Sequence, residues 1–272
     1  MSVRDKRVGF VGGGNMGEAL VRGLTKTGLM PVGHLLMADV RADRLEELKR
    51  LYGIVPVPDN VTLVRRADVV ILAVKPQTLG AVLDEVAPVT PGKLLISVAA
   101  GVSTGEIRRH LPPGTRMIRV MPNTPALVLE GATAIARAAG LEEGDLDTAR
   151  QIFEAVGRVV ILDEEMMDAV TGLSGSGPAY IALVVEALAD GGVRVGLDRK
   201  TAMTLAMQTV LGSARLLIDT GMHPGQLKDM VSSPGGTTIA GIHTLEIGGL
   251  RRTLIDAVER ATHRSRELGQ GH

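Results

Sequence analysis

The chain has 272 residues, and its 30 Lys and Arg balance 30 Asp and Glu. This length predicts about two domains, and zero net charge disfavours a sequence-independent nucleic-acid binder. The chain contains no Cys, which excludes disulfides, thiolate catalysis and Cys-ligated metal sites. Its six His form no H-x-x-x-H pair. We therefore expect a cytoplasmic protein without a metal site.

Neither a leader peptide nor a membrane span is expected. Residues 1–7 (MSVRDKR) are largely charged, and the apolar run that follows is interrupted at 12–14 by three glycines. No stretch is expected to reach the roughly 18 uncharged apolar residues that a span needs.

Short β-branched runs alternate with amphipathic segments over the first 163 residues, which is typical of βαβ units. Runs such as 68–74 (DVVILAV) are apolar without interruption, as a parallel sheet covered on both faces requires. The expected strands are 7–11, 34–38, 54–57, 68–74, 94–99, 116–121, 132–136 and 158–162. The expected helices lie near 18–26, 42–51, 61–66, 79–86, 105–110 and 146–156. This pattern predicts an α/β fold with a Rossmann-type, doubly wound parallel sheet.

The pattern changes after Asp163, where we place the boundary between domains 1–163 and 164–272. The expected helices of the second domain are 176–190, ended by Gly191 and Gly192, then 199–219, 226–230, 237–245 and 250–268. A stretch rich in glycine and serine at 172–178 is interpreted as a helix break. Small apolar residues cover nearly every face of 202–214 (AMTLAMQTVLGSA), and such a helix is buried on most sides. The second half therefore predicts an all-α domain that forms an interlocked dimer.

The strongest local signal is 8–17 (VGFVGGGNMG), in which Gly12, Gly14 and Gly17 form G-x-G-x-x-G. Gly12 permits a tight turn, Gly14 lets the backbone approach a pyrophosphate, and Gly17 lets helix and strand pack closely. In isolation the motif more often marks a simple turn. Its place directly after a strand and before a helix predicts a dinucleotide site.

Three charged residues after the second strand concern the choice of dinucleotide. Asp39 follows Gly17 by about 20 residues, the spacing of the acid that binds the adenosine ribose of NAD. Arg41 and Arg44 come next, and a guanidinium there could hold the 2′-phosphate of NADP. All three could instead belong to a solvated helix start, so the preference is left open.

Further candidates follow the later strands. Lys75 and Pro76 come at the end of the fourth strand, where open α/β sheets bind ligands. Lys75 could also be a surface residue at a turn that Pro76 fixes. Residues 99–101 (AAG) and Asn123 complete a rim of small residues and turns. A nicotinamide ring could lie flat there, with Asn123 bonded either to its amide or to its own turn.

A second motif is 231–238 (VSSPGGTT), between two expected helices. Two glycines, four hydroxyls and the free N–H groups of a helix start form a nest for a small carboxylate. The alternative is an ordinary capped loop.

These segments together resemble the pyrroline-5-carboxylate reductase family. The matching segments, in chain order, are VGFVGGGNMG, VILAVKPQ, SVAAGVS, RVMPNTPALV, TGLSGSGPAY, HPGQLKDMVSSPGGTTIAG and LIDAVERATHRSREL. The resemblance implies a Rossmann domain joined to a helical dimerisation domain, with dimers often assembled into a ring of five, a decamer. It also implies hydride transfer from NADPH or NADH to the C=N bond of 1-pyrroline-5-carboxylate, giving L-proline in the last step of proline biosynthesis.

The resemblance also implies roles for single residues. Those that would hold the pyrophosphate are Gly12, Gly13, Gly14, Asn15, Met16 and Gly17. Asn60 would meet the adenosine side, and the nicotinamide end would be lined by Ala73, Val74, Lys75, Pro76 and Ala99. The substrate carboxylate and ring would be held by Ser233, Gly236, Thr237 and Thr238. Thr238 would hydrogen-bond the ring nitrogen, and in the family this loop comes from the partner subunit.

Two other functions were weighed. The opening glycine motif also resembles β-hydroxyacid dehydrogenases, which need a Lys proton shuttle early in the helix after a glycine-rich break. Residues 178–186 (PAYIALVVE) contain no Lys. A non-catalytic dinucleotide-binding sensor or assembly protein is the alternative from another class, and the nest at 231–238 argues against it.

Overall fold

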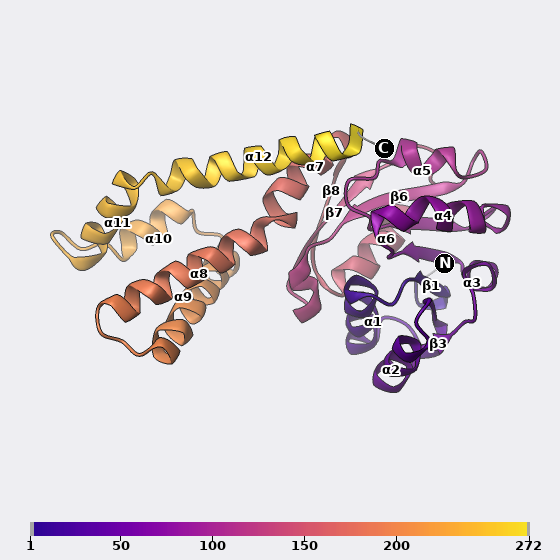
Figure 1. Ribbon diagram of the computed structural model, residues 1–272, viewed down its shortest axis with the longest axis horizontal. Coiled ribbons are helices and arrows are strands. Elements are labelled where there is room, and N and C mark those ends of the chain that lie inside the picture. Colours follow the sequence, from indigo (N-terminus) through magenta and orange to yellow (C-terminus); the bar gives the residue numbers. More distant parts are fainter. Residues whose placement is uncertain (1–2, 271–272) are drawn as a thin grey trace. The chain divides into compact units, whose positions relative to one another are not determined.

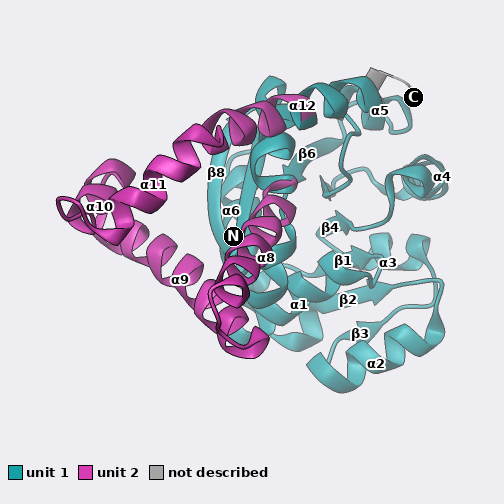
Figure 2. Cartoon of the chain, turned by 60° about the vertical axis from the view of Figure 1, so that its left-hand side comes forward, with its two compact units in different colours: residues 1–175, 261–272 teal, residues 176–260 magenta. Residues whose placement is uncertain are grey.

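The computed structural model describes residues 3–270, which form two compact units (Figures 1 and 2). Unit 1 contains the chain up to residue 175 and again from residue 261 onward, whereas unit 2 contains residues 176–260. Residues 164–175 therefore pack with the first unit. The domain boundary at Asp163 stays a prediction.

Unit 1 is built on an eight-stranded sheet in the order β3-β2-β1-β4-β5-β6-β7-β8. The strands are β1 (Val8–Val11), β2 (Leu35–Ala38), β3 (Val55–Pro56), β4 (Val69–Leu72), β5 (Leu94–Ser97), β6 (Arg116–Met121), β7 (Gly131–Arg137) and β8 (Gly157–Asp163). β1 pairs in parallel with both β2 and β4. The strand order therefore reverses beside β1, and the crevice beyond its carboxyl end is the usual ligand site of such a sheet.

Helices cover both faces of this sheet (Figure 1). On one face lie α1 (Asn15–Thr27), α2 (Ala42–Tyr52) and α6 (Asp145–Glu154), which share a buried cluster with Phe10 and Ile71. On the other lie α3 (Asn60–Arg66), α4 (Pro76–Val86) and α5 (Thr104–Arg109), which share a second cluster with Val70 and Leu72. Successive residues of β4 thus enter opposite clusters. The prediction of a doubly wound α/β sheet is confirmed.

One strand runs against the rest. β7 pairs antiparallel with β6, and β8 then pairs in parallel with β7. Only residues 122–130 connect β6 to β7, and they hold a single short 3₁₀ helix, Thr124–Val128. A parallel partner needs a crossover of about a dozen residues or more. The expectation of an all-parallel sheet is therefore wrong at this pair.

Short helical segments complete unit 1. The 3₁₀ helices are Val3–Asp5, Val32–His34, Ala87–Val89 and Glu164–Met166, besides the one before β7. α7 (Met167–Val170) continues directly into a π-helical turn, Thr171–Gly175. The stretch 172–178 holds most of this turn, a bend at Ser176 and the start of α8 at Gly177. Its interpretation as a break between two α-helices is therefore confirmed.

Unit 2 is all helical, as predicted. Its helices are α8 (Gly177–Arg194), α9 (Arg199–Thr220), α10 (Pro224–Met230), α11 (Thr237–Ile247) and the first half of α12 (Leu250–Gln270). α8 passes through Gly191 and Gly192, so the expected end at Asp190 is wrong. A Cβ on Gly192 would lie 3.0 Å from the Cβ of Ala202, so this glycine lets α8 and α9 approach closely. The helix ends before Gly196, whose φ is +107°.

Candidate active site

The glycine-rich loop joins β1 to α1 in a geometry that its glycines make possible. Gly12 has a φ of +103°, and a Cβ there would lie 2.6 Å from the carbonyl oxygen of Ala73. A Cβ on Gly17 would lie 2.4 Å from the carbonyl oxygen of Gly12, so α1 starts directly against the loop. A Cβ on Gly14 would meet no atom within 4 Å. The space beside the N-terminus of α1 is therefore open to a phosphate group.

A cavity of about 570 Å³ lies beside this loop, at the carboxyl ends of β1, β2 and β4. It brings together eight of the residues predicted to bind a dinucleotide: Gly12, Gly14, Asp39, Arg41, Asn60, Ala73, Val74 and Lys75. Five further residues line it and were not predicted to bind the cofactor: Val11, Ala38, Val40, Thr78 and Val82. Thr78 and Val82 are four residues apart on α4, so helical spacing after Lys75 is the signal that identifies them. Val40 and Val82 give the cavity an apolar wall suited to a base.

The remaining predicted residues do not line this cavity. They are Gly13, Asn15, Met16, Gly17, Pro76 and Ala99. Ala99 is buried at 3% exposure, and Pro76 is the first residue of α4, with Lys75 as its N-cap. Asn123 donates from Nδ2 to the carbonyl oxygen of Ser174 at 3.0 Å and accepts from the N–H of Ala132 at 2.8 Å. Its amide therefore ties the end of β6 to neighbouring segments of unit 1.

The charged residues after β2 differ in where their side chains lie. Asp39 accepts hydrogen bonds from the N–H of Gly13 at 2.7 Å and of Arg41 at 2.9 Å. The side chain of Arg41 is 57% exposed and lines the cavity. Arg44 is only 13% exposed and donates from Nε to the carbonyl oxygen of Gly13 at 2.9 Å. Of the two arginines, only Arg41 is presented to the cavity.

Glu18 of α1 anchors the buried arginine. It forms an ion pair with Arg44 and accepts from the hydroxyl of Tyr52 at 2.8 Å. Partial burial by itself raises the pKa of Glu18, but the hydrogen bonds from Arg44 and Tyr52 outweigh it and hold this pKa below its ordinary value. The carboxylate therefore stabilises the folded state in its charged form.

The substitution Glu18→Gln is expected to lower the melting temperature at neutral pH, because it removes this charged partner of Arg44. The pKa of Glu18 is lowered by folding, so its stabilising effect is complete above the unfolded carboxyl pKa of about 4.3. As the pH falls from there through the lower pKa of the folded state, the effect is lost. Melting curves of both proteins between pH 7 and 3 should therefore converge in acid. A constant difference across this range would contradict the assignment.

In unit 2, residues 233–236 form a tight turn before α11. Gly236 donates its N–H to the carbonyl oxygen of Ser233 at 3.0 Å, and Gly235 has a φ of +64°. Pro followed by a left-handed Gly is the preferred sequence of a type II turn. Because α11 begins at Thr237, the N–H groups of its first turn have no acceptor within the helix. Together with the partly buried Thr238, they can bind a small anion.

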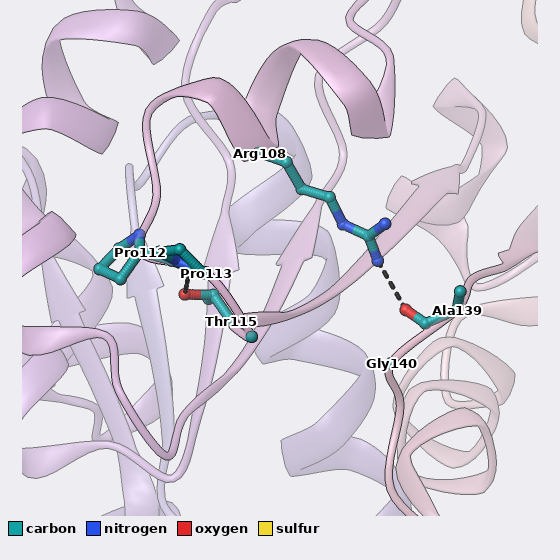
Figure 3. A pocket seen from close by; sticks show the side chains of 7 residues that line it. Arg108, Pro112, Pro113, Thr115, Ala139 and Gly140 are labelled. Carbon is teal, nitrogen blue, oxygen red and sulfur yellow. Dashed lines mark hydrogen bonds between the residues drawn. The ribbon is translucent and has the colours of Figure 1, made fainter.

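Figure 3 shows another cavity of unit 1, of about 290 Å³, between the end of α5 and the loop after β7. Arg108 spans it and donates to the carbonyl oxygen of Ala139 at 2.6 Å. None of the residues predicted to bind a dinucleotide or an imine lines this cavity. It is therefore separate from the candidate site.

The doubly wound sheet, the glycine loop and the adjoining cavity define a dinucleotide-dependent oxidoreductase, and residues 7–101 match the family model described as NADP oxidoreductase, coenzyme F420-dependent. Residues 164–268 match the model described as pyrroline-5-carboxylate reductase dimerisation. The chain is 50% identical to the pyrroline-5-carboxylate reductase of Methanosarcina acetivorans, over 98% of this chain and 100% of that relative. It is 46% identical to that of Arabidopsis thaliana, over 97% and 96%. The chain belongs to the pyrroline-5-carboxylate reductase family.

Solved structures of the family have the same fold. The reductase from Coxiella burnetii is 38% identical with a TM-score of 0.93, over 97% of this chain and 98% of that one. The Plasmodium falciparum enzyme, solved with NADP bound, is 33% identical with a TM-score of 0.87, over 98% and 99%. The cofactor of this chain is accordingly NADP, one of the two dinucleotides between which the sequence left the choice open.

Unit 2 leaves much apolar surface uncovered. Its buried hydrophobic residues, within the described part of the chain, are Ala189, Ala202 and Ala206. Large apolar side chains that are at least half exposed include Ile181, Leu183, Leu188, Leu205, Met207, Leu211, Ile218, Met230, Ile247 and Ile255. An apolar surface of this extent marks an interaction site. With the dimerisation model matching the same residues, it supports a homo-oligomer.

The same helices are also long and apolar enough to cross a membrane by length and composition. They are Glu164–Arg194 and Arg199–Thr220, each with a mean hydropathy of 1.2 over a window that is 11% buried. This contradicts the expectation that no stretch would suffice for a span. The dimerisation match over 164–268 supplies a protein partner for these faces.

Proposed function

We propose that this chain reduces the C=N bond of 1-pyrroline-5-carboxylate with NADPH, giving L-proline, at a site shared by two subunits. The observation that carries the proposal is that one chain contains both a dinucleotide cavity, in unit 1, and a turn before α11 that can bind a small anion, in unit 2. The chain is also 50% identical to a named reductase. The nest of one subunit would complete the cofactor site of its partner.

The residues present fit a bound dinucleotide. The open space at Gly14 and the N-terminus of α1 would take the pyrophosphate. Asn60 and Val40 would meet the adenosine, and Ala73 with Lys75 would adjoin the nicotinamide end. When bound, the reduced nicotinamide supplies the hydride.

The chain's own part in the chemistry is mostly positioning. In the proposed complex, the first N–H groups of α11 bind the substrate carboxylate, and the hydroxyl of Thr238 hydrogen-bonds the ring nitrogen, with Ser233 beside it. A protonated imine is already electrophilic at carbon, so one hydride converts it to the neutral secondary amine. Holding the imine against the hydride donor therefore accounts for most of the rate enhancement.

We also propose an oligomeric state and a cellular compartment for this protein. Two chains would form a homodimer through unit 2, and five dimers would form a decamer. The apolar helices would be covered by protein within that assembly, with no membrane and no nucleic acid as partner. We place the enzyme in the cytoplasm, where its zero Cys count suits reducing conditions.

The direct test follows absorbance at 340 nm with pyrroline-5-carboxylate and either NADPH or NADH. Rapid oxidation of NADPH with formation of proline is the expected result. Folded protein that binds NADPH but oxidises none of it would reject the proposed substrate.

The substitution Thr238→Ala is expected to lower kcat/KM for the imine about tenfold or more, because one hydrogen bond to the reacting ring is lost. Thr238→Ser should retain most of the activity, since it keeps the hydroxyl. Thr244→Ala on the same helix is the matched control, because the hydroxyl of Thr244 bonds to the carbonyl oxygen of Ala240. Unchanged kinetics in Thr238→Ala would remove Thr238 from this role.

A further inference from the structure

The backbone of Gly13, in the middle of the glycine loop, is held at both its N–H and its carbonyl oxygen by the segment after β2. Its N–H donates to Oδ2 of Asp39 at 2.7 Å, and its carbonyl oxygen accepts from Nε of Arg44 at 2.9 Å. A Cβ on Gly13 would lie 3.1 Å from side-chain atoms of both Leu48 and Met37, so the residue has little room to move. One carboxylate and one guanidinium thus fix the loop that faces the pyrophosphate.

Arg44 is itself fixed by further contacts. It bonds to Glu47 at 2.6 Å and is paired with Glu18. The guanidinium therefore has one partner on α1 and another on α2, besides the loop between β1 and α1. The side chain is 13% exposed and does not line the cavity. Its positive charge is therefore balanced by Glu18 and Glu47 rather than by a ligand in the cavity.

Asp39 is turned inward in a similar way. Its side chain is 10% exposed, and each of its oxygens already accepts a backbone N–H, one from Gly13 and one from Arg41. The side chain of Arg41, in contrast, is 57% exposed and lines the cavity. Its Nε lies 3.6 Å from Oδ1 of Asp39. Asp39 also lines the cavity, but both of its oxygens already accept backbone N–H groups. Of the three charged residues, Arg41 is therefore the one whose side chain is mostly exposed at the cavity.

We propose that Asp39 and Arg44 are positioning residues that clamp the backbone of Gly13, whereas Arg41 alone recognises the 2′-phosphate of NADPH. The division of roles rests on the proposed function only in that the cavity binds a nicotinamide dinucleotide. Removal of either clamp residue loosens the shared pyrophosphate loop, so NADPH and NADH are affected alike. Removal of Arg41 affects the phosphorylated cofactor alone.

The test titrates each folded variant with NADPH and NADH and follows the fluorescence of the reduced nicotinamide. For Arg41→Met, the Kd of NADPH should rise about tenfold or more while the Kd of NADH stays within about twofold. For Arg44→Met and Asp39→Ala, both Kd values should rise by the same factor, about tenfold. With imine present, KM for each cofactor should rise in these two variants while kcat at saturating cofactor is retained.

The matched control is Arg50→Met, which removes an exposed arginine from the same helix α2 and should change neither Kd. Arg44→Lys keeps the positive charge beside Glu18 and Glu47, so it serves if Arg44→Met folds poorly. A selective loss of NADPH binding in an Arg44 variant would overturn the proposal, as would a selective loss of NADH binding in Asp39→Ala. Because the titration needs no imine, failure to reduce the imine would reject the proposed function without touching this result.

Discussion

Replacing Gly12 with Ala is expected to weaken the binding of both nicotinamide cofactors about a hundredfold, or roughly 2.7 kcal/mol, because it displaces the loop that faces the pyrophosphate. The φ of Gly12 is +103°, and its new Cβ would lie 2.6 Å from the carbonyl oxygen of Ala73. Strain and overlap together should cost about 3 kcal/mol of folding free energy. For a domain of this size, the melting temperature should fall by roughly 6 to 12 °C.

Two other glycines provide the controls for this experiment. A Cβ on Gly14 would meet no atom within 4 Å, so Gly14→Ala should keep the melting temperature of the free protein. It should still weaken cofactor binding, because the methyl group enters the space left for the pyrophosphate. Gly33→Ala is equally uncrowded and lies outside the cavity, so it should change neither quantity. Normal binding by Gly12→Ala would show that the loop does not hold the dinucleotide as proposed.

Much of the fold could be predicted because local patterns and tertiary packing agree in unit 1. The residues of β4 enter both buried clusters in turn. An apolar run without interruption is the sequence pattern of a strand that is buried on both faces, so this burial could be predicted. The direction of β7 could not be predicted in the same way, because an apolar run has the same pattern in either direction. Gly192 was misjudged for a related reason. In the sequence, a glycine at this position indicates the end of a helix. The structure shows that Gly192 lies within α8 and lets the helix pack closely against Ala202 of α9.

In the candidate site, too, the features set by local sequence could be predicted and those set by long-range contacts could not. The glycine loop and the strand-end residues were predictable because strand, turn and helix succeed one another within ten residues of sequence. The different roles of Arg41 and Arg44 were not, since both are arginines at the start of one helix. Their difference arises from contacts that Arg44 makes with Gly13 and Glu18, 31 and 26 residues away. Sequence spacing does not contain such long-range information.

The substitution Leu211→Glu is expected to separate the subunits and abolish imine reduction. Leu211 is 61% exposed on α9, and Met207 and Ile218 on the same helix are also more than half exposed. Residues four and seven apart share one helix face, so these three side chains form one apolar stripe. Burying a leucine contributes about 1.5–3 kcal/mol, and a two-fold interface contains each substitution twice. The dimer should therefore weaken roughly a thousandfold or more.

Light scattering at micromolar concentration, together with the 340 nm assay, measures both effects. Leu51→Glu is the matched control, because Leu51 is 54% exposed on α2 in unit 1, outside the dimerisation match. It should leave the assembly and the activity unchanged. A Leu211→Glu protein that stays dimeric would place this stripe outside the interface. A monomer with full activity would instead contradict the shared site. In that site, the turn at Ser233 of one subunit binds the substrate beside the cofactor of the other subunit, so a monomer should be inactive.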